Sequence, residues 1–303
     1  RYALASGNCN EAEKLWPLIE WCLEYCHRQL NADGVVKSDS DELENRFPAG
    51  KANLCTSSLY YDALVSAAYL GKALKKEHKQ IKSYQDRAAE LYKNIDAYFA
   101  RNVEGYDTYR YYDGNTVLRS WICIPLTMGI YDQAKGTVEA LFSDKLWMEN
   151  GLLTQSGTST YWDRSTLYAF RGAYSCGARD IATEYLDKYS ATRLLGDHVP
   201  YAVEAWPEGN QRHLSTESAL YCRIMTEGLF GIRPIALDAF MMTPQLPESW
   251  NTMSLKRICA FGSIFDIEVK RDKDDKLLVL IKKDHKIVKR SKITNGKPIE
   301  VRI

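Results

Sequence analysis

Apolar residues return every three or four positions over most of the first 230 residues, the spacing of one face of an amphipathic helix. The pattern predicts eight helices, over residues 10–30, 56–75, 81–100, 115–130, 132–143, 163–176, 178–194 and 215–230. In the third of these, the apolar face consists of Ala88, Leu91, Ile95 and Phe99. Thr56 or Ser57 is the expected N-cap of the second helix. The first part of the chain is therefore predicted to be mainly α-helical.

The pattern changes after Pro234. The stretch "FDIEVKRDKDDKLLVLIKKDHKIVKRSKITNGKPIEVRI" alternates or runs apolar in pieces of strand length, with turns expected at "RDKDDK" and "NG". We therefore expect two domains, a helical one over residues 1–234 and a small antiparallel β-domain over residues 235–303.

The connections between the predicted helices are of two kinds. Some are short, such as "GARD" at 177–180, whereas the segments 31–55, 101–114, 144–162 and 196–214 are long and rich in Trp, Tyr, Asp and Glu. Short and long connections that alternate are typical of helical hairpins. We expect the long loops to gather at one end of the hairpins and to carry the function.

Composition narrows the classes of function. The 40 basic and 39 acidic residues give a net charge of +1, so a nucleic-acid partner is not expected. No apolar run is long enough for a membrane span. The five His show no metal-binding spacing, and we expect neither a catalytic metal nor a cofactor. The eight Cys form no CxxC pair; buried free thiols are the favoured interpretation, and their even number leaves disulfides open.

Aromatic and acidic residues point to sugar chemistry. The chain has 20 Tyr and 7 Trp, and such rings stack on the apolar face of a pyranose. The loop "DSDELENRF" contains four carboxylates, on Asp39, Asp41, Glu42 and Glu44. A second acidic loop, "VPYAVEAWPEGNQRHLSTE", contains Glu204, Glu208 and Glu217, with Trp206 and His213 nearby. Each loop is either a solvated segment before a helix or a source of catalytic carboxylates. The second alternative fits glycoside hydrolysis, which needs one carboxyl group as an acid and another as a base.

The order of these motifs resembles that of the six-hairpin glycosidases, the (α/α)6-barrel superfamily that includes processing α-glucosidases, trehalases, α-L-rhamnosidases and inverting α-L-fucosidases. The stretch "DSDELENRF…NLCTSSLYYDALVSAAYLGKALKK" is similar to the segment that carries the general acid. "DKLWMENGLLTQSGTSTYWDRSTLYAF" is similar to a substrate-binding segment, and "VEAWPEG" to the loop that supplies the base. "EGLFGIRPIALDAFMMTPQLPESW" resembles the exit from the barrel into a C-terminal β-sandwich.

The resemblance implies an (α/α)6-type helical-hairpin barrel followed by a β-sandwich, and an exo-acting, inverting glycosidase. It assigns the general acid to Glu42 and the general base to Glu204, with Asp41, Glu44 and Glu208 as competing carboxylates. The residues that it implies for substrate binding are Arg46, Phe47, Tyr161, Trp162, Asp163, Arg164, Trp206 and His213. Because a full barrel has twelve helices, we expect a C-terminal part of a longer enzyme, which would associate with the missing N-terminal part.

Two other classes of function fit the same pattern. One is a carbohydrate-binding or structural helical toroid without turnover. The other is a polysaccharide lyase, which would use groups such as Arg212, His213 and Tyr221 around a substrate carboxylate. The glycosidase interpretation implies an oligosaccharide or glycoside as substrate and a periplasmic or secreted location.

Overall fold

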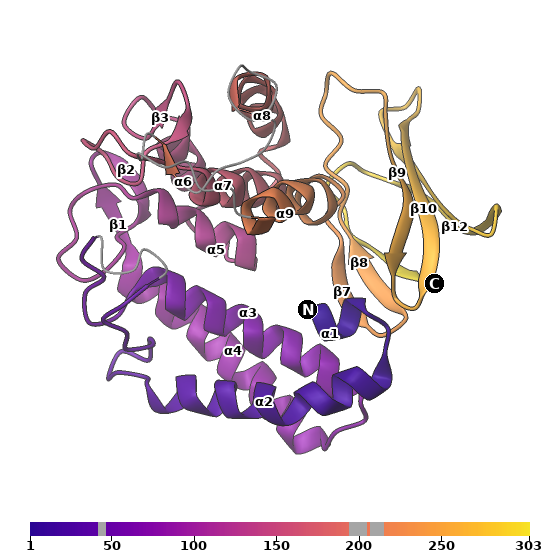
Figure 1. Ribbon diagram of the computed structural model, residues 1–303, viewed down its shortest axis with the longest axis horizontal. Helices are drawn as coiled ribbons and strands as arrows, with labels where there is room; N and C mark the ends of the chain where they lie inside the picture. Colours follow the sequence, from indigo (N-terminus) through magenta and orange to yellow (C-terminus); the bar gives the residue numbers. More distant parts are fainter. Residues whose placement is uncertain (42–46, 194–204, 207–214) are drawn as a thin grey trace.

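The computed structural model describes residues 1–41, 47–193, 205–206 and 215–303. Figure 1 shows a helical part, from indigo to orange, beside a β-part at the C-terminal end of the chain. A helical domain followed by a β-domain is thus confirmed. None of the helices within the described ranges combines the length and the apolar character that crossing a bilayer requires.

All eight predicted helices are present, and a short ninth element, α1, precedes them. The helices are α1 Tyr2–Ala5, α2 Cys9–Arg28, α3 Leu54–Ala73, α4 His78–Phe99, η1 Ser120–Ile122, α5 Cys123–Met128, α6 Ala134–Leu141, α7 Asp163–Ser175, α8 Arg179–Arg193, α9 Ser215–Arg223 and η2 Ile224–Leu229, which has π-helical geometry. The apolar face predicted for the third helix is the buried face of α4.

The helix α3 begins two residues earlier than expected. Its N-cap is Asn53, whose backbone is extended and whose side-chain oxygen accepts a hydrogen bond from the backbone N–H of Thr56 at 2.9 Å. The prediction of Thr56 or Ser57 as the cap was therefore wrong. A cap needs a backbone that has not yet entered the helix, and the loop determines where that entry occurs.

The helices form successive hairpins. α3 and α4, α5 and α6, and α7 and α8 are joined by short connections, and long connections lie between the hairpins. α5 packs against both α3 and α7, and α7 packs against α9 (Figure 1). The helices α3, α5, α7 and α9 therefore follow one another side by side, and their first residues lie at the same end.

The outer helix α2 exposes part of its apolar stripe. Ala12, Trp16 and Leu23 are buried, but Trp21 and Tyr25 are exposed and stack on each other. Cys9, Cys22, Cys26, Cys176, Cys222 and Cys259 are free thiols. Cys55 and Cys123 are buried, whereas Cys9, Cys22, Cys222 and Cys259 are exposed. The expectation of buried thiols was wrong for these four, because the pattern of apolar residues does not say which side of a helix or strand meets the core.

Short antiparallel strand pairs lie within the long loops. They are β1 Ala100–Val103 with β2 Tyr106–Tyr109, β3 Trp147–Met148 with β4 Gly151–Leu152, and β5 Tyr161–Trp162 with β6 Ala205–Trp206. The turn between β1 and β2 contains Glu104 and Gly105, both at positive φ, as a tight two-residue hairpin requires. The period of the apolar residues did not predict these pairs, because they are only two to four residues long.

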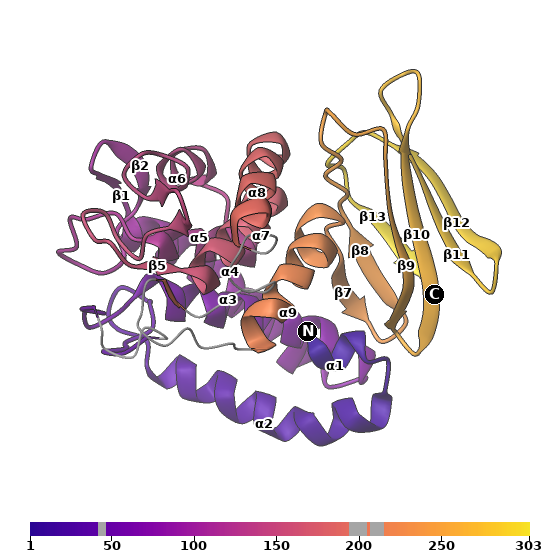
Figure 2. The ribbon, with the colours of Figure 1, turned by 45° about the horizontal axis from the view of Figure 1, so that its top comes forward.

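The β-part consists of two antiparallel sheets (Figure 2). Its strands are β7 Arg233–Ala236, β8 Ala239–Met242, β9 Thr252–Ala260, β10 Ser263–Arg271, β11 Leu277–Lys283, β12 Lys286–Ile293 and β13 Ile299–Arg302. One sheet has the order β12-β11-β10-β9 and the other β13-β8-β7. The ring of Phe240 in β8 stacks on Phe261 and Phe265, with centroids 5.1 and 5.6 Å apart, so the two sheets pack face to face.

The two parts are joined by both polar and backbone contacts. Arg233 in β7 donates a hydrogen bond to Asp62 of α3 at 2.8 Å, and the N–H of Phe261 donates to the carbonyl oxygen of Ala5. Asp62 lies in the middle of α3, so β7 reaches the flank of the helical part rather than its loops. The β-part therefore lies away from the end where the long loops meet.

Candidate active site

The long loops before α3, α5, α7 and α9 are joined to one another by backbone pairing. The bridges pair Asn53 with Tyr112, Arg119 with Gln155, Leu153 with Tyr161, and Tyr161 with Trp206. We call the described parts of these loops, residues 36–41, 47–53, 110–119, 152–162 and 205–206, the rim. The expectation that the chemically loaded loops gather at one end of the hairpins is confirmed.

The first rim loop holds a carboxylate against a buried tyrosine. The hydroxyl of Tyr111, which is fully buried, donates to Asp41 at 2.8 Å. The side-chain amide of Asn53 donates to the carbonyl oxygen of Ser40 at 3.1 Å. Asp41, a half-buried residue, is therefore fixed in orientation at the point where the acidic loop reaches the rim.

Arg119 lies at the centre of an aromatic cage that the sequence analysis did not identify. Its guanidinium lies 5.2 Å from the ring centroids of Phe47 and Tyr111 and 5.6 Å from that of Tyr112. It donates to the carbonyl oxygen of Pro48 at 2.9 Å and is almost completely buried. Burial lowers the pKa of the Arg119 guanidinium. The only signal in the sequence was a single arginine before the apolar run "SWICIPL".

The segment "YWDR" lies at the start of α7, as its resemblance implied. Trp162 and Asp163 are almost completely buried, and Tyr161 is half-buried. Asp163 accepts a hydrogen bond from Arg193 of α8 at 3.0 Å, and both members of this ion pair are buried. A carboxylate in the first turn of a helix also interacts favourably with the helix dipole. Asp163 therefore has a clear role in fixing the start of α7 beneath the rim.

A second ion pair, between a partly exposed arginine and a buried carboxylate, links α7 to α9. Arg164 donates to the carboxylate of Glu217 at 2.8 Å, and Glu217 lies in the first turn of α9 with no exposed surface. The second carboxylate oxygen of Glu217 has no hydrogen bond within the described part of the chain. Glu217 is a buried carboxylate at the rim end of its helix. The sequence showed it only as one of three acidic residues of its loop.

Several predicted site residues lie outside the described residues, namely Glu42, Glu44, Arg46, Glu204, Glu208 and His213. Of Trp206 the structure describes the backbone, which pairs with Tyr161. Among the predicted residues that are described, Asp41 and Phe47 meet around Tyr111 and Arg119, whereas Trp162, Asp163 and Arg164 form the start of α7.

Tyr221, a residue predicted for the lyase alternative, is engaged elsewhere. Its hydroxyl shares a hydrogen bond with that of Ser190 in α8 at 2.8 Å, and it lines a groove with Glu248 and Trp250. Arg212 and His213 lie outside the described residues. Within the described ranges, no group of three or more His, Cys, Asp or Glu residues could hold a metal ion.

Comparison with solved structures finds the same fold in several proteins. No protein-family model and no curated protein matches the sequence. A sialidase is 14% identical, with a TM-score of 0.73; the match covers 98% of this chain and 31% of the sialidase chain. A GH78 family rhamnosidase of Bacillus sp. GL1 is 12% identical with a TM-score of 0.59, covering 92% and 29%. The α-L-rhamnosidase from Dictyoglumus thermophilum is 13% identical with a TM-score of 0.55, covering 99% and 37%.

The chain thus spans about a third of the length of these proteins. Because the identities are low, the likeness shows a shared fold. Two of the proteins that share it are rhamnosidases, one of the classes that the order of motifs resembles.

Proposed function

We propose that this chain is part of an exo-acting glycoside hydrolase that inverts the anomeric centre, with its active site at the rim. The observation that carries the proposal is the backbone pairing that unites the described parts of the loops before α3, α5, α7 and α9, because these parts include the ends of both acidic loops, at Asp41 and at Ala205–Trp206. The fold shared with rhamnosidases and a sialidase supports the same class of reaction. In this proposal, residues 1–234 contribute hairpins to an (α/α)6-type barrel, and residues 235–303 form its β-sandwich.

The chemistry requires two carboxyl groups on opposite faces of the scissile bond. Glu42 is the proposed general acid that protonates the leaving oxygen, and Glu204 is the proposed base that activates water. Inversion requires roughly 6.5 to 9.5 Å between the two groups, so that the water fits between base and sugar. The hydrogen bond from Tyr111 to Asp41 supports Glu42 as the acid, because it fixes the residue immediately before Glu42 at the rim.

The proposed sugar-binding surface combines aromatic rings and cationic donors. Phe47 and Tyr161 are half-buried, so each ring presents part of its surface, and rings of this kind stack on the apolar face of a pyranose. Arg119 holds the ring of Phe47 from beneath. Arg46, Trp206 and His213 complete the proposed subsite. The proposed substrate is an oligosaccharide or glycoside, and the proposed location is periplasmic or secreted.

The test compares Glu42→Gln and Glu204→Gln in the full-length protein, with a panel of 4-nitrophenyl glycosides that includes α-L-rhamnoside, α-glucoside, α-L-fucoside and α-sialoside. We expect each variant to lower kcat with natural linkages by roughly 10²- to 10⁴-fold, because each removes a group that transfers a proton. With the nitrophenyl leaving group, which departs without protonation, Glu42→Gln should be the less damaged variant. Proton NMR of the first product should show the inverted anomer.

Glu300→Gln is the matched control, because Glu300 is an exposed carboxylate on β13, in the β-part. It should leave kcat unchanged. Retention of configuration would contradict the inverting mechanism. Saturable sugar binding without turnover by the unaltered protein would instead identify a non-catalytic carbohydrate-binding protein.

A further inference from the structure

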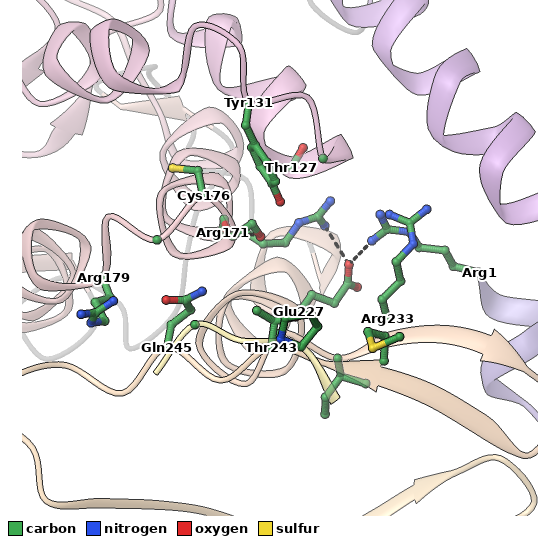
Figure 3. Close-up of a pocket in the computed structure, with 18 residues that line it drawn as sticks. Arg1, Thr127, Tyr131, Arg171, Cys176, Arg179, Glu227, Arg233, Thr243 and Gln245 are labelled. Atoms are coloured by element: carbon green, nitrogen blue, oxygen red, sulfur yellow. Dashed lines mark hydrogen bonds and ion pairs between the residues drawn. The ribbon is translucent and has the colours of Figure 1, made fainter. Parts of the chain in front are cut away.

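A polar cavity lies where α5 and α7 end, at the opposite end of the hairpins from the rim. Figure 3 shows the residues that line it. It has a volume of about 430 Å³ and is lined from the ends of α5 and α7, from η2 and from the strands β7 and β8. Its charged lining residues are Arg1, Arg171, Arg179, Arg233 and Glu227. We call this cavity the arginine pocket. Four cationic groups and one carboxylate give its wall a strongly positive character.

The ion pairs around the arginine pocket leave positive charge without a partner. Glu227 pairs with Arg1 at 2.6 Å, with Arg171 at 3.6 Å and with Arg223; Asp62 pairs with Arg1 and Arg233, both at 2.8 Å. Four guanidinium groups, those of Arg1, Arg171, Arg223 and Arg233, thus share two carboxylates, so two positive charges remain. Arg179, the other arginine of the lining, pairs with Asp180 at 3.8 Å. Charges removed from water are costly unless an opposite charge compensates them. The C-terminal ends of α5 and α7 offset only part of this excess.

Arg171 is the buried arginine of the pocket whose guanidinium lacks hydrogen bonds to described residues at both terminal nitrogens. Only 2% of it is exposed, and neither terminal nitrogen of its guanidinium has a hydrogen bond to any described residue. The nearest oxygen of Glu227 lies 3.6 Å away, and the ring of Tyr168 covers one side of the group. Burial lowers the pKa of Arg171 to about 10. A buried guanidinium whose two terminal nitrogens make no hydrogen bond to a described residue is well prepared for an oxyanion.

Two further features mark the pocket as a built site. The side-chain oxygen of Gln245 is buried at its wall and has no hydrogen bond within the described ranges. Glu227 lies in the π-helical turn η2, a geometry that is rare and is often found at functional positions. Figure 3 shows Arg171, Glu227 and Arg233 converging from α7, η2 and β7.

We propose that the arginine pocket binds a small oxyanion, either phosphate or the carboxylate of a sugar acid. The planar guanidinium of Arg171 matches two oxygens of such a group at once, and Arg233 adds charge from the opposite wall. Polar side chains of Thr127, Ser175 and Gln245 line the remaining space. The volume lies within the range of small-ligand sites, roughly 300 to 1,000 Å³, so a monosaccharide-sized body fits beside the anion. This proposal does not depend on the glycosidase proposal.

The test is isothermal titration of the full-length protein with inorganic phosphate and with glucuronate, each against sodium chloride at matched ionic strength. We expect saturable binding of at least one anion and none of neutral glucose. Phosphate binding alone would identify a phosphate-type ligand, and glucuronate binding alone would identify a carboxylate on a sugar body; either result supports the site.

Arg171→Met should weaken that binding by about tenfold or more, because it removes charge-assisted hydrogen bonds from a buried position. Arg302→Met removes an exposed arginine of β13 and should leave binding unchanged. Gln245→Met, a milder change at the pocket wall, should weaken binding by roughly threefold to tenfold. Equal binding by all four proteins, or no response beyond that to sodium chloride, would overturn the proposal.

Discussion

The two ends of the helical hairpins differ in how their charged side chains are paired. Beneath the rim, two buried carboxylates each have an arginine of their own: Asp163 pairs with Arg193, and Glu217 pairs with Arg164. At the arginine pocket, two carboxylates are shared among four arginines. The first arrangement fixes the starts of α7 and α9 beneath the rim. The second leaves donors unused, which suits binding of an anion rather than rigidity.

Asp163→Asn should have the largest effect on stability. The change leaves the guanidinium of Arg193 buried with a weaker partner, and breaking a buried pair in this way lowers the free energy of unfolding by about 3 to 5 kcal/mol. Urea unfolding followed by tryptophan fluorescence measures the loss. Glu184→Gln, which breaks the exposed pair of Glu184 and Lys188, is the control and should cost roughly 0.5 kcal/mol or less. If both variants lowered the free energy of unfolding equally, the buried pair beneath the rim would contribute no more to stability than an exposed pair.

Glu227→Gln tests the pocket end through its dependence on pH. Burial alone would raise the pKa of Glu227, but Arg171, Arg223 and Arg1 outweigh it and hold the pKa at about 2, below the ordinary 4.5. The ionised form therefore stabilises the fold above pH 4.5, and that contribution is lost as the pH falls towards 2. We expect the variant to lose roughly 2 to 3 kcal/mol at neutral pH.

The difference between Glu227→Gln and the unaltered protein should shrink between pH 4.5 and 2, as measured by urea titrations at a series of pH values. A difference that is constant with pH would mean that Glu227 acts by packing rather than by its charge. If the pocket binds an oxyanion, the variant should also bind phosphate more tightly, because it removes a competing negative charge.

Arg119→Met should have the smallest effect of the three. It removes a cation held over three rings, and such contacts contribute roughly 0.5 to 2 kcal/mol, the upper end applying to buried groups. Because the same guanidinium holds Pro48, hydrogen exchange of residues 47–53 should become faster while α3 stays protected. Lys188→Met is the control, since Lys188 is an exposed cation over the single ring of Tyr185 in α8, outside the rim. Unchanged exchange in the loop would show that Arg119 does not anchor the rim.

The sequence alone determined the local architecture of this protein. The apolar period of 3.6 residues predicted eight helices, and the change to strand-length runs after Pro234 predicted the β-domain. Long acidic and aromatic loops indicated where chemistry should lie, and the order of motifs indicated the glycosidase fold. These features are local, because backbone geometry and the burial of one face act within a few residues of chain.

Only the tertiary structure decided which distant side chains meet. Asp41 meets Tyr111, Arg164 meets Glu217, and Arg233 meets Asp62 across 171 positions of chain. Nothing in the spacing of a lone arginine distinguishes Arg119, which holds Pro48 from within an aromatic cage, from Arg171, which lines a cavity. The difference comes from burial, which removes water as a competing partner and makes the position of each remaining donor matter.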